Sequence, residues 1–162
     1  MTDFELMGAA LEEARKAAAL GEVPVGAVVA KDGEIISAAH NTRETEKNAL
    51  HHAELLAIDA ACKKLGGWRL WECELFVTLE PCPMCAGAIL NARIPKVFYG
   101  ARDSTFGACG GVTNLFMEQF PHRPLWWAEF WRRTVRRYWR NFSKSFAKES
   151  RRRKVFKKRG EI

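Results

Sequence analysis

The chain has 162 residues, of which 48% are hydrophobic and 28% are charged, and its formal net charge is +7. This length suits one domain with a sizeable core, and two ordinary domains would be cramped in it. No run of 18 or more apolar residues is present, so neither a membrane-spanning helix nor a membrane partner is expected. The acidic N-terminus lacks the basic and apolar regions of a signal peptide, so a cytoplasmic location is expected.

The charge is distributed unevenly along the chain. Residues 1–122 carry 11 Lys/Arg and 16 Asp/Glu, whereas residues 123–162 carry 15 and 3. A basic region of this density is typical of proteins that bind a polyanion, most often nucleic acid; the alternative is a solvated helix face with a frayed tail. We expect one domain over residues 1–150, including a basic C-terminal helix, and a basic flexible tail over residues 151–162.

The first half of the chain predicts a helix and a hairpin. Apolar residues recur at helical spacing over residues 3–20, and Gly21 follows, so an amphipathic helix is expected there. Residues 25–30 and 34–36 are short apolar runs on either side of an Asp-Gly turn, which predicts a β-hairpin. Residues 41–48 are polar and predict a loop.

The second half alternates between helical and strand patterns. Helices are expected over residues 51–65 and 82–91, and strands over residues 74–79 and 96–100. A longer helix, in which arginines alternate with aromatic residues, is expected over residues 126–146. Helices that alternate with strands indicate a layered α/β domain, whose site lies at strand ends where helices begin.

Two short motifs carry the chemistry. A His-x-Glu motif begins one predicted helix at His52, and a Pro-Cys-x-x-Cys motif begins the next at Cys82. Zinc prefers imidazole nitrogen and thiolate sulfur in a tetrahedron, so His52, Cys82 and Cys85 are the candidate ligands. Three protein ligands leave a fourth position for water, as in catalytic zinc sites. Glu54 lies close to such a metal without binding it and is the candidate proton shuttle.

Either motif alone is compatible with a different role. A His-x-Glu at a helix start is commonly a cap, and a Cys-x-x-Cys can be a redox pair or half of a structural zinc site. Together they favour one catalytic zinc ion per subunit, because the chain has no second Cys-x-x-Cys to complete a four-thiolate site. We expect His51 to be a solvent-facing neighbour, since a fourth protein ligand would close the open position.

Beyond these motifs, several segments resemble the bacterial tRNA-specific adenosine deaminases. They include Gly-Glu-Val-Pro-Val-Gly-Ala-Val at residues 21–28, the run around the cysteines at residues 77–88 and Tyr-Gly-Ala-Arg-Asp at residues 99–103. The resemblance is close over about residues 3–125 and looser beyond them. It implies a three-layer α/β/α cytidine-deaminase-like fold, with a central mixed sheet flanked by helices, and a homodimer.

The resemblance also implies the reaction. It is hydrolytic deamination of adenosine to inosine in RNA, at the wobble position of a tRNA anticodon, by zinc-activated water with Glu54 as proton shuttle. A tRNA anticodon stem-loop is therefore the expected partner, and single-stranded DNA is the alternative. Substrate contacts implied by the same resemblance fall on Val23, Asn41, Ala53, Leu79, Ala101, Asp103 and Phe142.

Two other functions stay open. The same chemistry can act on deoxyadenosine or cytosine in single-stranded DNA, or on a free base such as guanine or cytosine. A different class is a nucleic-acid-binding protein with a purely structural zinc, against which Glu54 argues because such a site needs no carboxylate.

The predicted C-terminal helix departs from the family, in which this stretch is acidic and aliphatic and ends in paired phenylalanines, of which only Phe142 remains. By helical spacing, Trp131, Val135 and Tyr138 are expected to pack on the sheet. The interleaved arginines are then free to meet phosphate.

Overall fold

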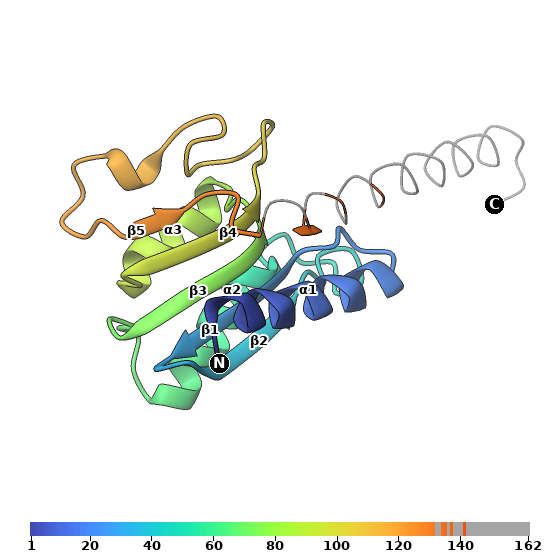
Figure 1. The fold of residues 1–162 in the computed structure, drawn as a ribbon, viewed down its shortest axis with the longest axis horizontal. Helices are drawn as coiled ribbons and strands as arrows, with labels where there is room; N and C mark the ends of the chain where they lie inside the picture. The colour runs from blue at the N-terminus through green and yellow to red at the C-terminus, as the bar shows by residue number, and fades with distance from the viewer. Residues whose placement is uncertain (132–133, 136, 138–140, 142–162) are drawn as a thin grey trace, which may run out of the picture.

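The fold is built on a mixed β-sheet. The computed structural model describes residues 1–131 together with residues 134, 135, 137 and 141, and this part contains a five-stranded sheet in the order β2-β1-β3-β4-β5 (Figure 1). The strands are β1 (Gly26–Lys31), β2 (Glu34–His40), β3 (Cys73–Leu79), β4 (Lys96–Ala101) and β5 (Leu125–Trp127). β1 pairs antiparallel with β2 and β3, whereas β4 runs parallel to both β3 and β5.

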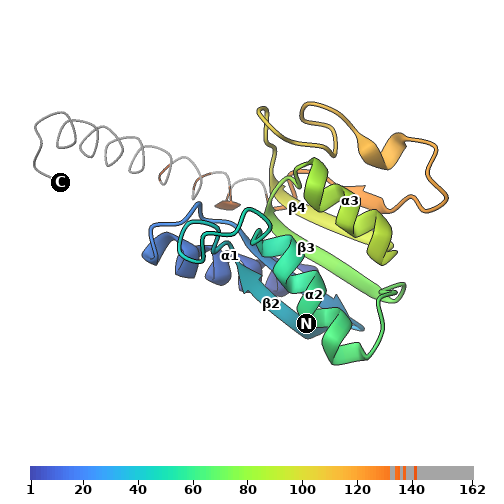
Figure 2. The same ribbon diagram turned by 180° about the vertical axis from the view of Figure 1, so that it is seen from behind.

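Helices cover both faces of the sheet. α1 (Asp3–Ala19) lies on one face, and α2 (Ala53–Leu65) and α3 (Pro83–Ala92) lie on the other, as the two opposite views show (Figures 1 and 2). A short 3₁₀ helix, η1 (Leu115–Met117), lies in the connection between β4 and β5. This arrangement confirms the predicted three-layer α/β/α fold.

Local sequence explains the first elements. Thr2 and Glu5 form a capping box at the start of α1, in which the Glu5 carboxylate accepts the Thr2 amide at 2.8 Å. Asp32 and Gly33, with φ angles of 51° and 75°, make the tight turn between β1 and β2, as the Asp-Gly pair predicted. The helices and strands predicted between residues 3 and 100 are all present, with ends shifted by a few residues.

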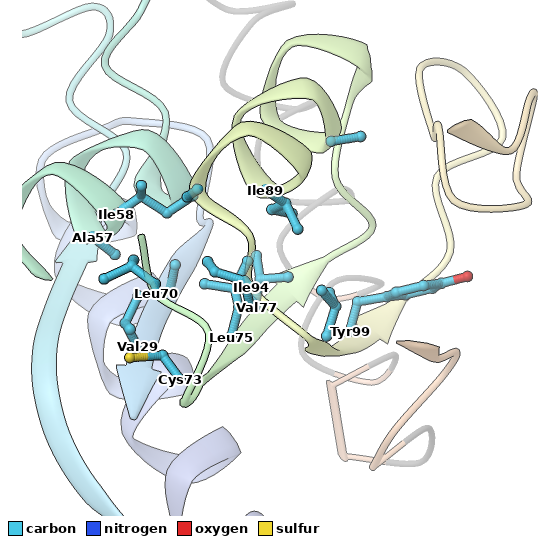
Figure 3. Packing of buried hydrophobic residues seen from close by; sticks show 14 of the residues in the cluster. Val29, Ala57, Ile58, Leu70, Cys73, Leu75, Val77, Ile89, Ile94 and Tyr99 are labelled. Carbon is cyan, nitrogen blue, oxygen red and sulfur yellow. The ribbon is translucent and has the colours of Figure 1, made fainter. Parts of the chain in front are cut away.

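The larger part of the core lies between the sheet and the helices α2 and α3. Figure 3 shows Leu75 and Val77 of β3 gathered with Ile89 of α3, and all three side chains are fully buried. Ala57 and Ile58 of α2 belong to the same cluster. Because this packing seats both helices firmly on the sheet, it also fixes where their N-termini lie.

Aromatic rings dominate the opposite face beside α1. The ring of Phe98 stacks between those of Phe76 and Trp127, with centroid distances of 4.6 and 4.5 Å. Val135 is fully buried in the same cluster, and Trp131 packs against it. The expectation of packing on the sheet is confirmed for Val135, which lies against Gly100 of β4, whereas the Trp131 ring lies against Phe4 and Gly8 of α1. Tyr138 lies outside the described residues.

The helix predicted from residue 126 is wrong at its beginning. Trp126 and Trp127 belong to β5, and Glu129 and Trp131 have positive φ angles of 54° and 64°, which no α-helix contains. The stacking of Trp127 on Phe98 stabilises an extended edge strand, and tryptophan favours strands. Residues 142–162, which include the predicted tail, lie outside the described part. Within the described part, no helix is long and apolar enough to cross a membrane.

Candidate metal and substrate site

Two helix N-termini meet at the site. His52 is the N-cap residue of α2 and Cys82 is that of α3, three residues after the end of β3. Pro83 occupies the first turn of α3, where its missing N–H costs no hydrogen bond. Cys85 follows one turn later, so that both sulfurs face the same point. The positive end of the α3 dipole favours thiolate over thiol at this position.

The three predicted metal ligands lie within reach of one ion. His52 Nδ1 is 3.7 Å from Cys82 Sγ and 3.6 Å from Cys85 Sγ, and the three atoms all lie within 4.8 Å of one another. Tetrahedral zinc with ordinary Zn–N and Zn–S bonds separates such ligand atoms by about 3.5–3.8 Å. Hydrogen bonding with Cys85 lowers the pKa of Cys82 to about 4. The nitrogen and sulfur donors therefore fit zinc in both spacing and chemistry.

His51 lies beside this group but belongs to another set of contacts. Its Nδ1 lies 2.7 Å from a carboxylate oxygen of Glu46, and its Nε2 lies 2.8 Å from Asn48 Nδ2. The His51 side chain is 26% exposed, so it faces solvent in part, as the sequence suggested. Nε2 contacts Asn48 and Nδ1 lies near Glu46, both in the loop before α2, so His51 is not part of the candidate ligand group.

Glu54 lies in the first turn of α2, directly after the His52 cap. Its side chain is buried, and this burial raises the pKa of Glu54 to about 7. It also interacts with the thiol of Cys85. A buried carboxylate beside the ligand group is what a proton shuttle requires.

A cavity of about 470 Å³ opens in front of these residues. It is lined by His52, Cys82 and Glu54, and its volume is typical of small-molecule sites. Five of the seven predicted substrate contacts also line it, namely Val23, Asn41, Ala53, Leu79 and Asp103. The structure thus brings these residues together, and their contacts with substrate remain predictions.

The other two predicted contacts lie elsewhere. Ala101, at the end of β4, is buried outside the cavity lining, and its carbonyl accepts the backbone N–H of Glu80 at 2.8 Å. Phe142 lies outside the described residues. Ala101 therefore does not line the cavity itself, but it is hydrogen-bonded to Glu80, which does.

The cavity also has lining residues that sequence reasoning missed, among them Arg43, Glu80, Met84 and Phe106. Arg43 and Phe106 lie two and three residues after the predicted contacts Asn41 and Asp103. Their proximity along the chain was the only available signal, since loops have no hydrophobic period.

A buried carboxylate, Glu22, organises one wall of the cavity. Its Oε2 accepts the Asn41 side-chain amide at 3.1 Å, and its Oε1 accepts the backbone N–H and the hydroxyl of Thr45 at 2.7 and 2.8 Å. Burial alone would raise the pKa of Glu22, but the hydrogen bonds from Thr45 outweigh it and the pKa is lowered. Glu22 thereby holds the Nδ2 end of the Asn41 amide.

A second buried carboxylate, Glu80, organises the wall formed by residues 103–111. Its Oε2 accepts the backbone N–H of Asp103 at 3.0 Å, and its Oε1 accepts those of Cys109 and Gly111 at 2.9 and 2.7 Å. A Cβ on Gly111 would lie 2.6 Å from a Glu80 oxygen, so only glycine allows the chain to approach this closely. The loop thus wraps around the side chain of Glu80, which accepts three of its N–H groups.

Comparison with known proteins identifies the class of this site. The family model for MafB19-like deaminases matches residues 1–136. A tRNA-specific adenosine deaminase of Bacillus subtilis (strain 168) is 54% identical over 125 residues, which are 76% of this chain and 78% of that protein.

Two solved structures share the fold. A structure from studies of A-to-I editing by tRNA:A34 deaminases at the wobble position of transfer RNA has a TM-score of 0.75 and 40% identity, and the match covers 77% of this chain and 97% of that one. A guanine deaminase from Bacillus subtilis has a TM-score of 0.62 and 35% identity, covering 87% and 95% respectively.

The mixed sheet, the His-Cys-Cys group and the family match together define a deaminase. Within that class, the chain belongs to the family of tRNA-specific adenosine deaminases. This membership confirms the resemblance drawn from the sequence.

Proposed function

We propose that this chain hydrolyses adenosine to inosine in RNA, at the wobble position of a tRNA anticodon. The observation that carries the proposal is the grouping of His52, Cys82 and Cys85 within reach of one ion, at a cavity that the buried Glu54 also lines. The proposal is supported by the family to which the chain belongs and by its similarity to a solved structure from work on tRNA:A34 deaminases.

His52, Cys82 and Cys85 would hold one zinc ion, whose donor set they fit. When bound there, zinc supplies the Lewis-acid chemistry that makes water reactive at neutral pH. His52 Nδ1 and the two sulfurs, which lie against one another, would be the atoms that face the ion.

Glu54 would manage the protons of the reaction. Deamination of adenosine places a water oxygen on C6 and releases the 6-amino group as ammonia, so protons must reach N1 and the departing nitrogen. The Glu54 carboxyl lines the cavity at the ligand group and is shielded from bulk water. It is therefore placed to take a proton from water and to deliver protons to the base.

The rest of the cavity would hold the nucleoside. Val23 and Leu79 supply apolar walls, and Asn41 supplies a fixed polar group. Ala53 is small and fully buried, which leaves room for a flat base beside the helix start. Base and sugar would thus be oriented by side chains whose own positions are set by neighbouring contacts.

An RNA substrate is favoured over a free base by charge. Residues 123–162 carry 15 Lys/Arg and 3 Asp/Glu, and a free base gains little from so much positive charge, whereas a phosphodiester chain gains much. The likeness to a guanine deaminase is the specific observation in favour of the second candidate, a free purine base.

One substrate panel tests the proposal. The purified chain is incubated with an anticodon stem-loop RNA, the matching single-stranded DNA, free adenosine and free guanine, and products are measured by mass and by ammonia release. Inosine in the RNA is expected, with loss by about 10²-fold or more in Glu54→Ala. Glu12→Ala, an exposed glutamate of α1, is the matched control and should retain activity. Turnover of free guanine alone would reject the RNA proposal, and preference for DNA would favour single-stranded DNA.

Removal of the metal separates a catalytic from a structural ion. Chelation should abolish inosine formation while circular dichroism shows most of the secondary structure retained, because a domain of this length has its own hydrophobic core. Global unfolding on chelation would favour the nucleic-acid-binding class with a structural zinc.

Two further parts of the proposal concern the molecule in the cell. We propose that the chain acts as a homodimer in the cytoplasm, as the family resemblance implies. Light scattering of the purified chain tests the first part, and cell fractionation tests the second.

A further inference from the structure

We propose that Phe106 is a stacking platform for the base of a nucleotide adjacent to the reacting adenosine. The inference rests on the proposed function, because it requires a polynucleotide in the cavity. Its starting point is one side chain: Phe106 is 66% exposed and at the same time lines the catalytic cavity.

An exposed phenylalanine on its own carries little meaning, because scattered apolar side chains are normal on protein surfaces. Phe106 differs from the exposed Phe120, which lies in the same connection between β4 and β5 but outside the cavity lining. Within the described residues, no ring contact joins Phe106 to another aromatic side chain. Its ring is therefore left available to a ligand at the cavity.

The backbone that carries Phe106 is held in place from both sides. The Asp103 side chain accepts the backbone N–H groups of Thr105 and Phe106 at 2.8 and 3.2 Å. The Asp103 carbonyl also accepts the N–H of Gly107 at 3.1 Å, which closes the turn. Glu80 anchors this turn by accepting the Asp103 N–H. A ring on such a pre-ordered turn loses little conformational freedom when a base stacks on it.

The neighbouring chemistry suits a nucleotide. Arg43, which lines the same cavity, has a half-exposed guanidinium group that is paired only with the exposed Glu44 among the ion pairs of the described residues. An aromatic face together with a cationic group is the combination with which proteins bind single-stranded nucleic acid. Every base has a π-face, so Phe106 would hold the neighbouring nucleotide without selecting its sequence.

A protein–RNA double-mutant cycle tests this. Wild type and Phe106→Ala are assayed on the anticodon stem-loop and on two versions that carry an abasic site directly 5′ or 3′ of the target adenosine. On intact RNA, Phe106→Ala should lower kcat/KM on the order of tenfold. On one of the abasic RNAs the two proteins should differ by less than about twofold, because the stacked base is gone.

Matched variants separate stacking from bulk. Phe106→Trp should retain activity on intact RNA, whereas Phe106→Leu, which keeps an apolar side chain without an aromatic face, should lose most of what Phe106→Ala loses. Phe120→Ala removes an exposed ring outside the cavity and should behave as wild type. Zinc content and melting temperature are measured for each protein, and Phe106→Leu keeps the test decisive if Phe106→Ala does not fold.

The outcomes distinguish this inference from the function on which it rests. If wild type forms no inosine in any RNA, the proposed function fails. If wild type is active but Phe106→Ala loses nothing, or loses equally on intact and both abasic RNAs, the function stands and the stacking role is overturned. An uncoupled loss with an altered oligomeric state would place Phe106 in a contact between copies of the chain, which also overturns it.

Discussion

The two walls of the cavity are each organised by a buried carboxylate, but by different means. Glu80 accepts three backbone N–H groups from residues 103–111, whereas Glu22 accepts side-chain donors from Asn41 and Thr45 as well as backbone N–H groups of residues 44 and 45. A wall held through its backbone keeps its shape whatever side chains it displays. In a wall held partly through side chains, those side chains have their positions fixed by the hydrogen bonds that they make.

This difference suggests a division of labour. The Glu80 wall is free to present an exposed residue such as Phe106 to a substrate, and that residue can change without loss of the loop. The Glu22 wall has its polar residue, Asn41, oriented from behind, so a change there alters the site directly. Substitutions at these carboxylates and at Thr45 test this difference, and the effect should be largest at Glu80 and smallest at Thr45.

Glu80→Ala should be the most damaging. It leaves three backbone N–H groups without an acceptor, that of the buried Cys109 among them, and it opens a void beside Gly107 and Gly111. Hydrogen bonds to charged groups contribute about 1.5–3 kcal/mol each, and such losses are not fully additive, so the free energy of unfolding should fall by about 4 kcal/mol. Urea denaturation of the zinc-loaded protein measures this.

Glu80→Gln is the matched control for that change. It keeps one oxygen that can accept from Cys109 and Gly111, but its NH₂ group then faces the Asp103 N–H. We expect a loss of about half that of Glu80→Ala. Equal stability of wild type and Glu80→Ala would show that the loop does not depend on this carboxylate.

Glu22→Gln should have a smaller effect with a characteristic pH dependence. The pKa of Glu22 is lowered in the folded chain, so its ionised form stabilises the fold above the ordinary value of 4.5, and this stability is lost as the pH falls through the folded pKa. The difference in unfolding free energy between wild type and Glu22→Gln should be about 2 kcal/mol at neutral pH and should shrink below about pH 4.5.

Denaturation curves at pH 7, 5, 4 and 3 provide the measurement. A difference that stays constant over this range, or grows in acid, would contradict an ionised Glu22. In Glu22→Gln the one remaining oxygen can serve the two donors of Thr45, so that an NH₂ group faces Asn41 Nδ2 and Asn41 loses its acceptor. The kcat/KM on stem-loop RNA should therefore also fall. Glu80→Gln should lower kcat/KM to the same extent only if the loop shifts Asp103 or Phe106.

Neither of these anchors was predictable as such from the sequence. The predicted metal ligands and Glu54 could be found from the sequence because they form short motifs at helix starts, where spacing along the chain maps directly onto spacing in the structure. Glu22 and Glu80 lie within segments that resemble the family. Their role arises from donors 19–31 residues away, and no local pattern encodes such contacts.

The same argument explains what was right and wrong in the fold. Elements from α1 to β4 follow hydrophobic periods that a single helix or strand shows by itself. β5 has three residues and exists because Trp126 pairs with Val97, far earlier in the chain, and because Trp127 stacks on Phe98. A segment whose conformation depends on such distant contacts reads as helical when its aromatic residues happen to recur every three or four positions.

Thr45→Val should have the smallest effect, and it separates the contribution of the Thr45 hydroxyl from that of the other donors to Glu22. It removes one hydroxyl donor to Glu22 while the backbone N–H of residue 45 and the Asn41 amide still reach the carboxylate. The loss in unfolding free energy should be about 1 kcal/mol, measured by urea denaturation beside Glu22→Gln. Activity on stem-loop RNA should stay close to that of wild type, since Asn41 keeps its partner. A loss of activity as large as that of Glu22→Gln would mean that Thr45, and not the hydrogen bond to Asn41, carries the effect of this carboxylate on the site.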